Sequence, residues 1–481
     1  MRILYDADCT TARLDPDEPL DADLIATLSR ALSYVKPGAV FTPEFKRGLW
    51  DGRVKFFDEE DLSFPAGLAR RVRDILAARD ITPEIIDERP DPPWPPDIAL
   101  PDLAGVTLFD DQKIALAALL ANPRGCLQFP TGGGKSLLAA ALAKAARPAR
   151  VLFIVDRKSL AGQTLREFRA KLQETIGIAG GGFSETTRRV TVATIQYLWH
   201  HRKRLQRTLF PEIRLLLVDE AHEMSEKTWR RTLDTIPAPA RIGLSATIRE
   251  APKRMLVEAL LGPLVHEVSD QELVAAGRQP ETRVSFLRCG GLVSDLDDVY
   301  MRGVVRNEHR NRLVIDAVLR AIKAQWPFLI LLVRIEHGQF LARELSMRGV
   351  NIPFLWGQTP IDVIERAKRD LQARRLPGIM ASTIMDKGHD LPNVRLVILA
   401  GAGRADHKTI QRIGRGRRLS PDGDPIVDVL DFWDMSHRSL QSQARDRFNV
   451  CKRKGYKPEI RDMIDVFPRP RREALILDDL A

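Results

Sequence analysis

Residues 126–146 read CLQFPTGGGKSLLAAALAKAA. A short apolar run opens this stretch, three glycines follow, and an alanine- and leucine-rich segment that favours a helix closes it. This order of strand, glycine loop and helix is typical of a phosphate-binding loop in an α/β domain. The glycines let backbone N–H groups turn toward a phosphate, and the helix N-terminus adds the positive end of its dipole. The stretch therefore predicts a parallel α/β sheet that binds a nucleotide.

Six consecutive residues of this loop are expected to contact ATP: Thr131, Gly132, Gly133, Gly134, Lys135 and Ser136. Lys135 can place its positive charge against the phosphates, and the Ser136 hydroxyl can ligate Mg²⁺. Phe129 stands where the general pattern has its first glycine, and a fortuitous glycine-rich loop is the alternative to a phosphate site. A second motif is needed to distinguish a phosphate site from a fortuitous loop.

That second motif follows the apolar run from Leu215 to Val218, which ends in Asp219-Glu220-Ala221-His222. Acids at the C-terminal end of a parallel strand stand in the crevice where open α/β sheets bind ligands. We expect Asp219 to hold the Mg²⁺ ion and Glu220 to orient and polarise the attacking water. A solvated acidic strand end is the alternative for this motif alone. Both motifs in this order, in one domain, favour an ATP site.

Composition narrows the class of protein. The chain has 481 residues, too many for one ordinary core, and its apolar fraction of 44% is that of a globular protein without a membrane-spanning run. Its four cysteines, Cys9, Cys126, Cys289 and Cys451, lie far apart, which argues against zinc, an iron–sulfur cluster or disulfides. The net charge of +10 suits a polyanionic partner. The start does not read as a signal peptide, so we expect the protein in the cytoplasm of a bacterium or a phage-infected host.

Changes in composition divide the chain into domains. Six prolines between Asp87 and Leu103 indicate a linker, and apolar runs alternate with helical stretches on its C-terminal side, which indicates parallel sheets covered on both faces. The predicted ranges are a small α+β N-terminal domain at 1–88, a linker at 89–104, an α/β domain at 105–268, an interdomain linker at 269–283, a second α/β domain at 284–450 and a tail at 451–481.

With these motifs the sequence resembles the superfamily 2 helicases of the DEAD/DEAH-box type. The resemblance implies that Gln112 reads the adenine of ATP and that Phe109 stacks on it. Motifs Ia and Ic of the family are matched around Asp156 to Gln163 and Val192 to Gln196. These matches imply nucleic-acid contacts by Arg157, Gln163, Thr194 and Gln196. The family's coupling of ATP to nucleic acid is implied for His222, Ser245, Ala246 and Thr247.

The second half of the chain carries the family's motifs V and VI. Residues 411–418 read QRIGRGRR, and two arginines three apart lie on one face of a helix. The resemblance implies that Arg415 and Arg418 are arginine fingers that, with Gln411, complete the ATP site, while a basic surface helix is the alternative. In motif V it assigns Thr383 to the nucleic-acid backbone, and Gly388 and Asp390 to the ATP side. The implied fold is two tandem RecA-like parallel-sheet domains that share one ATP site.

Within the superfamily, the chain resembles the phage UvsW-type DNA helicases, which are related to XPB-like and type III restriction-like motors. Residues 45–52, FKRGLWDG, and 64–68, FPAGL, look like the small domain ahead of that motor. We expect Lys46, Arg47 and Trp50 to bind branched or duplex DNA, with branch migration, fork reversal or unwinding of D-loops and R-loops as candidate activities. An RNA–DNA hybrid is a further candidate substrate. A monomeric motor without a membrane partner is expected, with ATP and Mg²⁺ as cofactors.

Three alternatives remain open at this point. An RNA helicase would make similar backbone contacts, because the residues that read a 2′-hydroxyl are not visible in the sequence. A DNA-translocating subunit of a restriction system would share the same motor. A small-molecule phosphotransferase would share the phosphate loop but would leave the second half and its arginines unexplained. ATPase measurements with matched DNA and RNA separate these classes.

Overall fold

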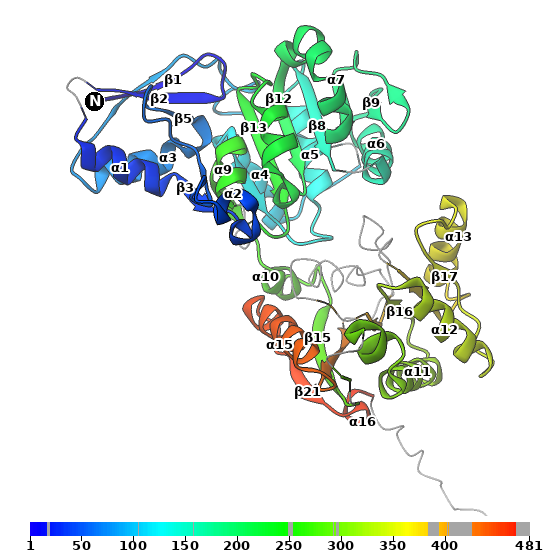
Figure 1. Ribbon diagram of the computed structural model, residues 1–481. Helices are drawn as coiled ribbons and strands as arrows, with labels where there is room; N and C mark the ends of the chain where they lie inside the picture. The colour runs from blue at the N-terminus through cyan, green and yellow to red at the C-terminus, as the bar shows by residue number, and fades with distance from the viewer. Residues whose placement is uncertain are drawn as a thin grey trace, which may run out of the picture. The chain divides into compact units, whose positions relative to one another are not determined.

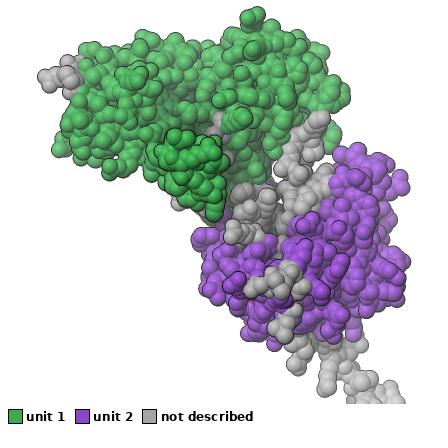
Figure 2. Space-filling model, viewed as in Figure 1, with its two compact units in different colours: residues 1–130, 134–269 green, residues 131–133, 270–481 purple. Residues whose placement is uncertain are grey.

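The computed structural model describes the chain apart from residues 17–19, 104, 157, 249–253, 292, 295–297, 383–393, 402, 404–425 and 468–481. The chain divides into two compact units (Figure 2): residues 1–130 with 134–269, and residues 131–133 with 270–481. Each unit is built around its own parallel sheet (Figure 1). The predicted α/β class with two RecA-like sheets and a small N-terminal α+β part is confirmed.

The main sheet of the first unit has eight strands in the order β10-β9-β11-β8-β12-β13-β7-β14, and every described pair is parallel except the β9–β10 hairpin. The strands are β7 (Arg124–Gln128), β8 (Arg150–Val155), β9 (Gly177–Gly180), β10 (Phe183–Ser184), β11 (Val190–Thr194), β12 (Ile213–Asp219), β13 (Ala240–Ser245) and β14 (Leu264–Glu267).

Helices cover both faces of this sheet, which is why its central strands read as unbroken apolar runs. The helices are α4 (Asp110–Ala121), α5 (Lys135–Ala145), α6 (Lys158–Leu172), α7 (Ile195–Thr208), α8 (Arg231–Leu233) and α9 (Arg254–Leu261). Because the strands are parallel, the segments that follow β7, β8, β11, β12 and β13 all leave the same edge of the sheet. The predicted site motifs stand in these segments.

The N-terminal part folds as a mixed four-stranded sheet, β5-β2-β1-β6, with a separate β3–β4 hairpin. Its elements are β1 (Arg2–Tyr5), β2 (Thr11–Asp15), α1 (Ala22–Ala31), β3 (Ser33–Val35), η1 (Ala39–Phe41), α2 (Pro43–Lys46), β4 (Arg53–Lys55), β5 (Ser63–Pro65), η2 (Ala66–Leu68), α3 (Ala69–Ala77) and β6 (Glu84–Asp87). Leu24 and Leu28 lie one turn apart on α1 and are buried, and the chain then leaves the helix so that Val35 pairs with Arg53 in the hairpin.

This N-terminal part and the first parallel sheet share one apolar core. Gly67 lies so close to α9 that an added Cβ would overlap the carbonyl oxygen of Glu258, and the Arg71 side chain donates two hydrogen bonds to the carboxylate of the same Glu258. The proline-rich stretch is also attached, because the buried Trp94 donates its indole N–H to the carbonyl oxygen of Leu120 at 3.0 Å. The stretch predicted as a linker therefore packs on the first unit.

The second unit has a seven-stranded parallel sheet in the order β17-β18-β16-β19-β20-β15-β21. The strands are β15 (Glu281–Cys289), β16 (Phe328–Leu331), β17 (Phe354–Leu355), β18 (Gly378–Ala381), β19 (Leu396–Leu399), β20 (Ile426–Asp434) and β21 (Glu459–Arg461). The helices are α10 (Asp270–Ala275), α11 (Glu308–Lys323), α12 (Ile335–Ser346), α13 (Ile361–Gln372), α15 (Arg438–Arg453) and α16 (Met463–Val466). Helix α10 and the start of β15 fall in the range predicted as the interdomain linker, and β21 and α16 fall in the range predicted as the tail.

Candidate functional site

The phosphate loop leaves the end of β7 and runs into the N-terminus of α5, as its sequence predicts. Gly132 and Gly134 have φ angles of 82° and 108°, a region that residues with a Cβ rarely adopt. The Lys135 ammonium donates to the carbonyl oxygens of Phe129 and Pro130 at 3.2 and 3.4 Å, which folds the side chain back over its own loop. The Lys135 side chain and the N-terminal turn of α5 therefore lie next to each other at the end of the loop.

Gln112 lies against this loop. Its side chain is buried, its amide oxygen accepts a hydrogen bond from the Phe109 N–H at 3.1 Å, and a Cβ added to Gly134 would overlap its amide nitrogen. Gly134 is therefore needed for two reasons, its backbone conformation and the space that Gln112 occupies. Phe109, at the N-cap of α4, is 56% exposed. The structure places the predicted adenine-reading pair beside the phosphate loop.

Asp219 and Glu220 stand at the carboxyl end of β12, where the strand leaves the sheet. Burial and, after it, the charge of the nearby Glu220 raise the pKa of Asp219 to about 7, although the charges of Lys135 and His222 act in the opposite direction. The charge of Lys135 therefore acts on Asp219 across the edge of the sheet. Glu220 adopts a φ of 47°, and its N–H donates to the Asp219 carboxylate at 3.0 Å. The turn holds the two carboxylates side by side.

His222 connects this turn to the end of the neighbouring strand β13. Its Nδ1 atom lies 2.7 Å from the Ser245 hydroxyl, which also accepts a hydrogen bond from the Thr247 N–H at 3.1 Å. Burial lowers the pKa of His222, but a hydrogen bond to Glu223 and the charges of Glu220 and Glu223 outweigh it, so the pKa is raised. The predicted coupling residues Ser245 and Thr247 are both buried next to this link. Ala246, which lies between them, is half-buried.

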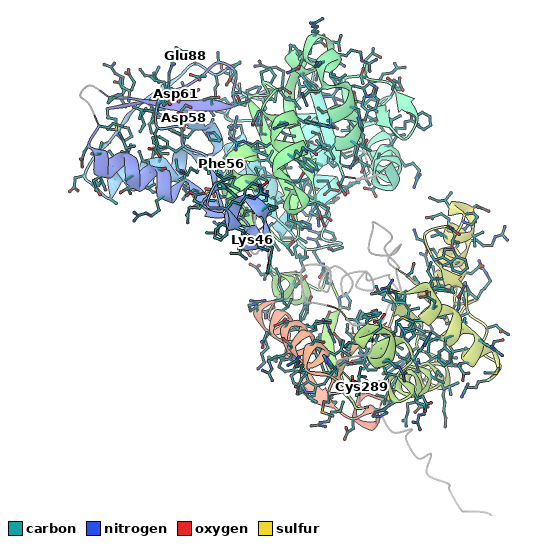
Figure 3. The ribbon with its side chains drawn as sticks, viewed as in Figure 1. Lys46, Phe56, Asp58, Asp61, Glu88 and Cys289 are labelled. Carbon is teal, nitrogen blue, oxygen red and sulfur yellow. The ribbon has the colours of Figure 1, made fainter. Side chains whose placement is uncertain are left out.

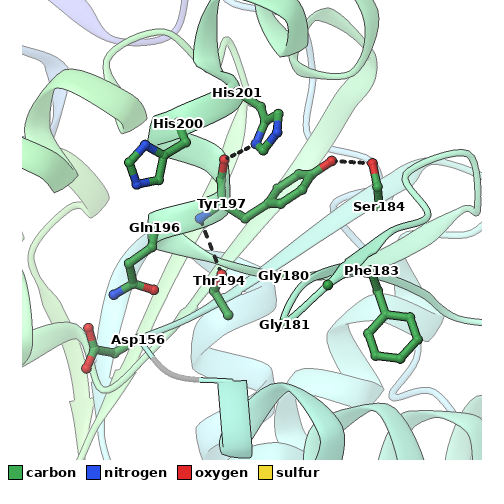
Figure 4. Close-up of a pocket in the computed structure, with 11 residues that line it drawn as sticks. Asp156, Gly180, Gly181, Phe183, Ser184, Thr194, Gln196, Tyr197, His200 and His201 are labelled. Carbon is green, nitrogen blue, oxygen red and sulfur yellow. Dashed lines mark hydrogen bonds between the residues drawn. The ribbon is translucent and has the colours of Figure 1, made fainter.

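A groove of about 710 Å³ opens at the same edge of the sheet, beyond β8 and β11 (Figure 4). Its lining includes Asp156 at the end of β8, Thr194 and Gln196 at the β11–α7 junction, and the glycines of the β9–β10 hairpin. A Cβ on Gly180 would lie 2.5 Å from the Thr194 hydroxyl, so the hairpin can approach β11 only because that residue is glycine. Thr194 and Gln196 were predicted from the sequence, and the structure brings them into one groove.

Other lining residues of the groove were not predicted from the sequence. They are Gly180, Gly181, Gly182, Phe183, Ser184, Tyr197, His200 and His201. The Phe183 side chain is 61% exposed at the hairpin, while Tyr197 is held by its hydroxyl, which lies 2.5 Å from the Ser184 hydroxyl. The sequence feature that could have indicated this groove is the run of three glycines, Gly180 to Gly182, at the end of a short strand. Glycines give access to the backbone N–H groups, which can bind phosphate.

Several predicted site residues lie outside the described part of the chain. They are Arg157, Thr383, Gly388, Asp390, Gln411, Arg415 and Arg418, and the side chain of Gln163 is also outside it. The structure does describe Ala400 and Gly403, which precede the range 404–425 in the chain. Arg310 donates from Nε to the carbonyl oxygen of Ala400 at 3.0 Å, and Arg447 donates to the carbonyl oxygen of Gly403 at 2.8 Å. Two buried guanidinium groups thus hold the chain where it enters the range 404–425.

The predicted N-terminal contacts lie on the β3–β4 hairpin and its helical tip. Lys46 (Figure 3) and Arg47 are exposed at the end of α2. Trp50, in contrast, is turned inward, because its indole N–H donates to the carbonyl oxygen of Arg53 at 2.9 Å and the Lys36 ammonium lies 5.7 Å from its ring centre. The most exposed apolar residues of the tip are Phe41 and Leu49, at 77% and 75%. Trp50 is half-buried, so these two face solvent more fully than the predicted Trp50 does.

Three family models match the chain. The model of the type III restriction enzyme res subunit matches residues 105–250, the helicase conserved C-terminal domain matches 313–420, and the N-terminal domain of DNA helicase UvsW matches 8–84. The first covers the phosphate loop and the Asp219 turn, the second covers motifs V and VI, and the third covers the exposed hairpin tip. Together the three ranges cover more than half of the chain.

Similar proteins agree with these matches. A helicase-like protein of the Sulfolobus islandicus filamentous virus is 26% identical over 65% of this chain and 61% of its own length, so the chain spans about three fifths of that relative. The DNA 3'-5' translocase XPB2 of Sulfurisphaera tokodaii is 25% identical over 83% of this chain and 96% of its own length. Among solved structures, Saccharomyces cerevisiae Dbp5 bound to RNA and ADP BeF3 aligns with 74% of this chain and 90% of that chain, at 16% identity and a TM-score of 0.54. This last likeness supports the fold alone.

Two further properties concern membranes and metals. No helix in the described ranges is both long and apolar enough to cross a bilayer. Within the same ranges, no group of three or more His, Cys, Asp or Glu side chains is arranged to hold a metal ion. The four cysteines are all buried and unpaired. Burial raises the pKa of Cys289 to about 11, and that of Cys451 to about 12, so both are thiols at neutral pH.

Proposed function

The chain belongs to the superfamily 2 helicases of the UvsW and XPB type, and from this premise we propose that it is an ATP-driven DNA translocase that remodels branched or duplex DNA. One observation carries the proposal. The Lys135 loop, the Asp219 turn and the groove around Thr194 all lie at the carboxyl edge of one parallel sheet. The hydrogen bond between His222 and Ser245 links neighbouring strand ends at this edge. The residues proposed for ATP hydrolysis and those proposed for nucleic-acid contact therefore stand at one edge of the same sheet.

The residues of the first unit fit ATP with Mg²⁺. Asp219 is half-buried at a strand end, and its pKa is raised because desolvation and the charge of Glu220 outweigh the charges of Lys135 and His222. Bound Mg²⁺ supplies positive charge there and neutralises the phosphates. Ser136 and Asp219 would hold the ion, Lys135 would bind phosphate oxygens, and Glu220 would orient the attacking water. Gln112 and Phe109 would hold the adenine.

The second half supplies the remaining proposed roles. Arg415 and Arg418 are the proposed arginine fingers, with Gln411, Gly388 and Asp390 on the ATP side and Thr383 on the nucleic acid. The match of the helicase conserved C-terminal domain to residues 313–420 supports these assignments. Arg418→Ala should leave ATP binding intact and slow turnover by on the order of 10³-fold. Normal turnover in this variant would remove Arg418 from the mechanism.

The groove is the proposed path of the nucleic-acid backbone. Hydroxyl, amide and glycine N–H groups bind phosphates without reading bases, so this path suits a motor that moves along any sequence. Thr194 and Gln196 stand in the groove itself, and Arg157 and Gln163 are proposed to act beside it. The same contacts would accept RNA or an RNA–DNA hybrid. DNA is favoured because the chain matches a domain of the DNA helicase UvsW and is similar to the DNA 3'-5' translocase XPB2.

The N-terminal tip is the proposed element that selects branched DNA. Phe41 and Leu49 expose apolar side chains beside the cations Lys46 and Arg47, a combination found where a protein wedges into a base stack while it holds the phosphates. Phe41→Ala with Leu49→Ala should reduce unwinding of forked and four-way DNA, and should spare ATPase activity on single strands. Because the N-terminal part shares its core with the first sheet, this pair of surface changes is a cleaner test than deletion of residues 1–87.

The decisive experiment measures ATP hydrolysis and strand displacement with single-stranded, duplex, forked and four-way DNA, with matched RNA and with an RNA–DNA hybrid. We expect hydrolysis to rise on DNA, and branched DNA to be displaced faster than simple duplex. Lys135→Ala is the control without hydrolysis. Equal stimulation by matched RNA would point to an RNA helicase, and turnover that ignores nucleic acid would point to a small-molecule phosphotransferase.

A further inference from the structure

Helix α7, which begins at the groove, carries a continuous polar stripe. Gln196, His200, Lys203 and Arg207 follow one another at intervals of three and four residues, so they lie on one face of the helix, and all four are exposed. The buried residues of the helix, Ile195, Leu198 and Leu205, lie on its opposite side. The first two members of the stripe, Gln196 and His200, also line the groove (Figure 4). The stripe therefore leads from the groove along the helix surface.

The charge of α7 has one sign. Its 14 residues include Arg202, Lys203, Arg204 and Arg207 and two histidines, and contain no aspartate or glutamate. Two of these arginines are occupied within the helix, since Arg202 stacks on the Trp199 ring at 4.4 Å and Arg204 donates to the Tyr197 hydroxyl at 2.8 Å. Among the described residues, Lys203 and Arg207 form neither an ion pair nor a side-chain hydrogen bond. An exposed helix of this kind repels cations and attracts a polyanion.

The dimensions suit a nucleic-acid backbone. An α-helix rises about 1.5 Å per residue, so the stripe from Gln196 to Arg207 is about 16 Å long. One strand advances about 3.4 Å per nucleotide along the helix axis of DNA, and the stripe thus matches roughly five nucleotides. Its amide, imidazole, ammonium and guanidinium groups can all donate hydrogen bonds to phosphate oxygens, and contacts of that kind carry no base preference.

We propose that the Gln196–Arg207 stripe binds the sugar–phosphate backbone of the strand that leaves the groove, and so extends the DNA track along α7. The inference rests on the proposed DNA translocase, and it adds residues that the motifs do not mark. It assigns to Lys203 and Arg207 one phosphate contact each. The contacts lengthen the bound segment of DNA and take no part in ATP hydrolysis.

The test is the salt dependence of DNA binding by the full-length chain. Wild type and Lys203→Ala/Arg207→Ala are titrated onto a labelled single strand long enough to fill both the groove and the stripe, over a series of salt concentrations. Each lost phosphate contact lowers the slope of log K against log salt by about 0.7 for a single strand, so the double variant should lose about 1.4 from its slope. ATPase turnover at saturating DNA should be unchanged, and more DNA should be needed for half-maximal stimulation.

A matched variant removes the same charge elsewhere. Arg312→Ala/Arg320→Ala takes two exposed arginines from α11 in the second unit, and should leave the slope as in wild type. A double α7 variant with the wild-type slope would overturn the inference even if DNA stimulates the ATPase. A wild type that hydrolyses ATP at the same rate without DNA, yet still shows the slope difference, would instead count against the translocase. Both α7 positions are exposed, and an unchanged melting temperature confirms that the variant is folded.

Discussion

Ser245 shows how one hydroxyl group can join two parts of the candidate site. It lies 2.7 Å from His222 Nδ1, and it accepts a hydrogen bond from the Thr247 N–H. Ser245→Ala removes both bonds and leaves Lys135, Asp219 and Glu220 in place. We expect hydrolysis with DNA to stay within a few-fold of wild type, and strand displacement to fall by about tenfold or more, a change of about 1.4 kcal/mol. Paired ATPase and displacement assays give both rates.

The control for this prediction is a double-mutant cycle. If His222 and Ser245 act through the hydrogen bond between them, then His222→Ala/Ser245→Ala should displace strands no more slowly than the poorer of the two single variants. Losses that add in the double variant would mean that the two residues act separately. A fall in hydrolysis equal to the fall in displacement would mean that Ser245 belongs to the hydrolytic step itself.

His337 is a second residue whose role can be measured alone. Its Nε2 lies 2.8 Å from Asn311 Oδ1, the ring is fully buried, and burial together with the charge of Arg310 lowers its pKa to about 3. The unfolded chain binds a proton near pH 6.5 and the folded chain does not, so this residue stabilises the fold above pH 6.5 and that stability is lost as the pH falls. The buried ring and its hydrogen bond to Asn311 indicate a structural role for His337.

The pH dependence predicts how a variant without the imidazole should behave. His337→Gln should be less stable than wild type at about pH 7.5, and the gap in unfolding free energy should narrow by about 2 kcal/mol by about pH 5. Urea unfolding at several pH values measures both proteins. A gap that stays constant over this range would show that His337 takes up its proton at the same pH in the folded protein as in the unfolded chain.

Among the elements, β20, α11 and α15 are held together by buried charges. Asp434 at the end of β20 accepts hydrogen bonds from Arg310 on α11 and from Arg447 on α15, and Arg447 also bonds to Asp431 at 2.9 Å. Arg310 and Arg447 are at most 5% exposed at the side chain. Because removal of one partner leaves the other charge buried and unpaired, Asp434→Ala should cost about 3–5 kcal/mol in unfolding free energy.

The matched control for this prediction is an exposed pair of the same unit. Asp370 pairs with Arg375 at 2.6 Å, with side chains 29% and 64% exposed. Asp370→Ala should therefore cost less than about 1 kcal/mol. Urea unfolding of both variants gives the comparison. Equal losses in the two variants would show that burial of the Arg310–Asp434 cluster adds nothing to its stabilising effect.

The sequence predicted the central strands because they are buried on both faces. Val151–Val155 and Leu215–Val218 are unbroken apolar runs, and each lies in a central strand of the first sheet. The edge strands were missed for the opposite reason, as β10 and β17 are two residues long and β21 is mostly polar. Strand β15 was also missed, because charged residues interrupt its apolar positions and a proline precedes it.

The sequence predicted those residues of the candidate site that belong to short, contiguous motifs. Lys135, Asp219 and Ser245 stand in short motifs whose residue types and order indicate their chemistry, and the structure places them at one edge of the sheet. Phe183 and Lys203 were not predicted, because their importance depends on exposure beside a groove that only the fold creates. A basic helix and an exposed aromatic residue are common in sequences, and neither indicates a site without its neighbours.

At the scale of the whole molecule, the N-terminal part is joined to the first parallel sheet within one compact unit. The close approach of Gly67 to the backbone of α9 and the Arg71–Glu258 ion pair lie at this junction. An added Cβ at Gly67 would meet backbone atoms, which cannot rotate away as a side chain can, and it would lie 2.7 Å from the Ala259 carbonyl oxygen. We therefore expect the N-terminal part and the first sheet to unfold together.

Gly67→Ala tests this expectation. Overpacking at the junction should cost about 1–3 kcal/mol, and because the apolar core is continuous, hydrogen exchange should speed up in β1 and β2 and in β12 and β13 alike. Exchange in the second unit should stay at the wild-type rate. Gly162→Ala is the control in the same unit, since its added Cβ would meet only the end of the Arg166 side chain, at 4.0 Å. Faster exchange confined to residues 1–88 would show that the N-terminal part unfolds on its own.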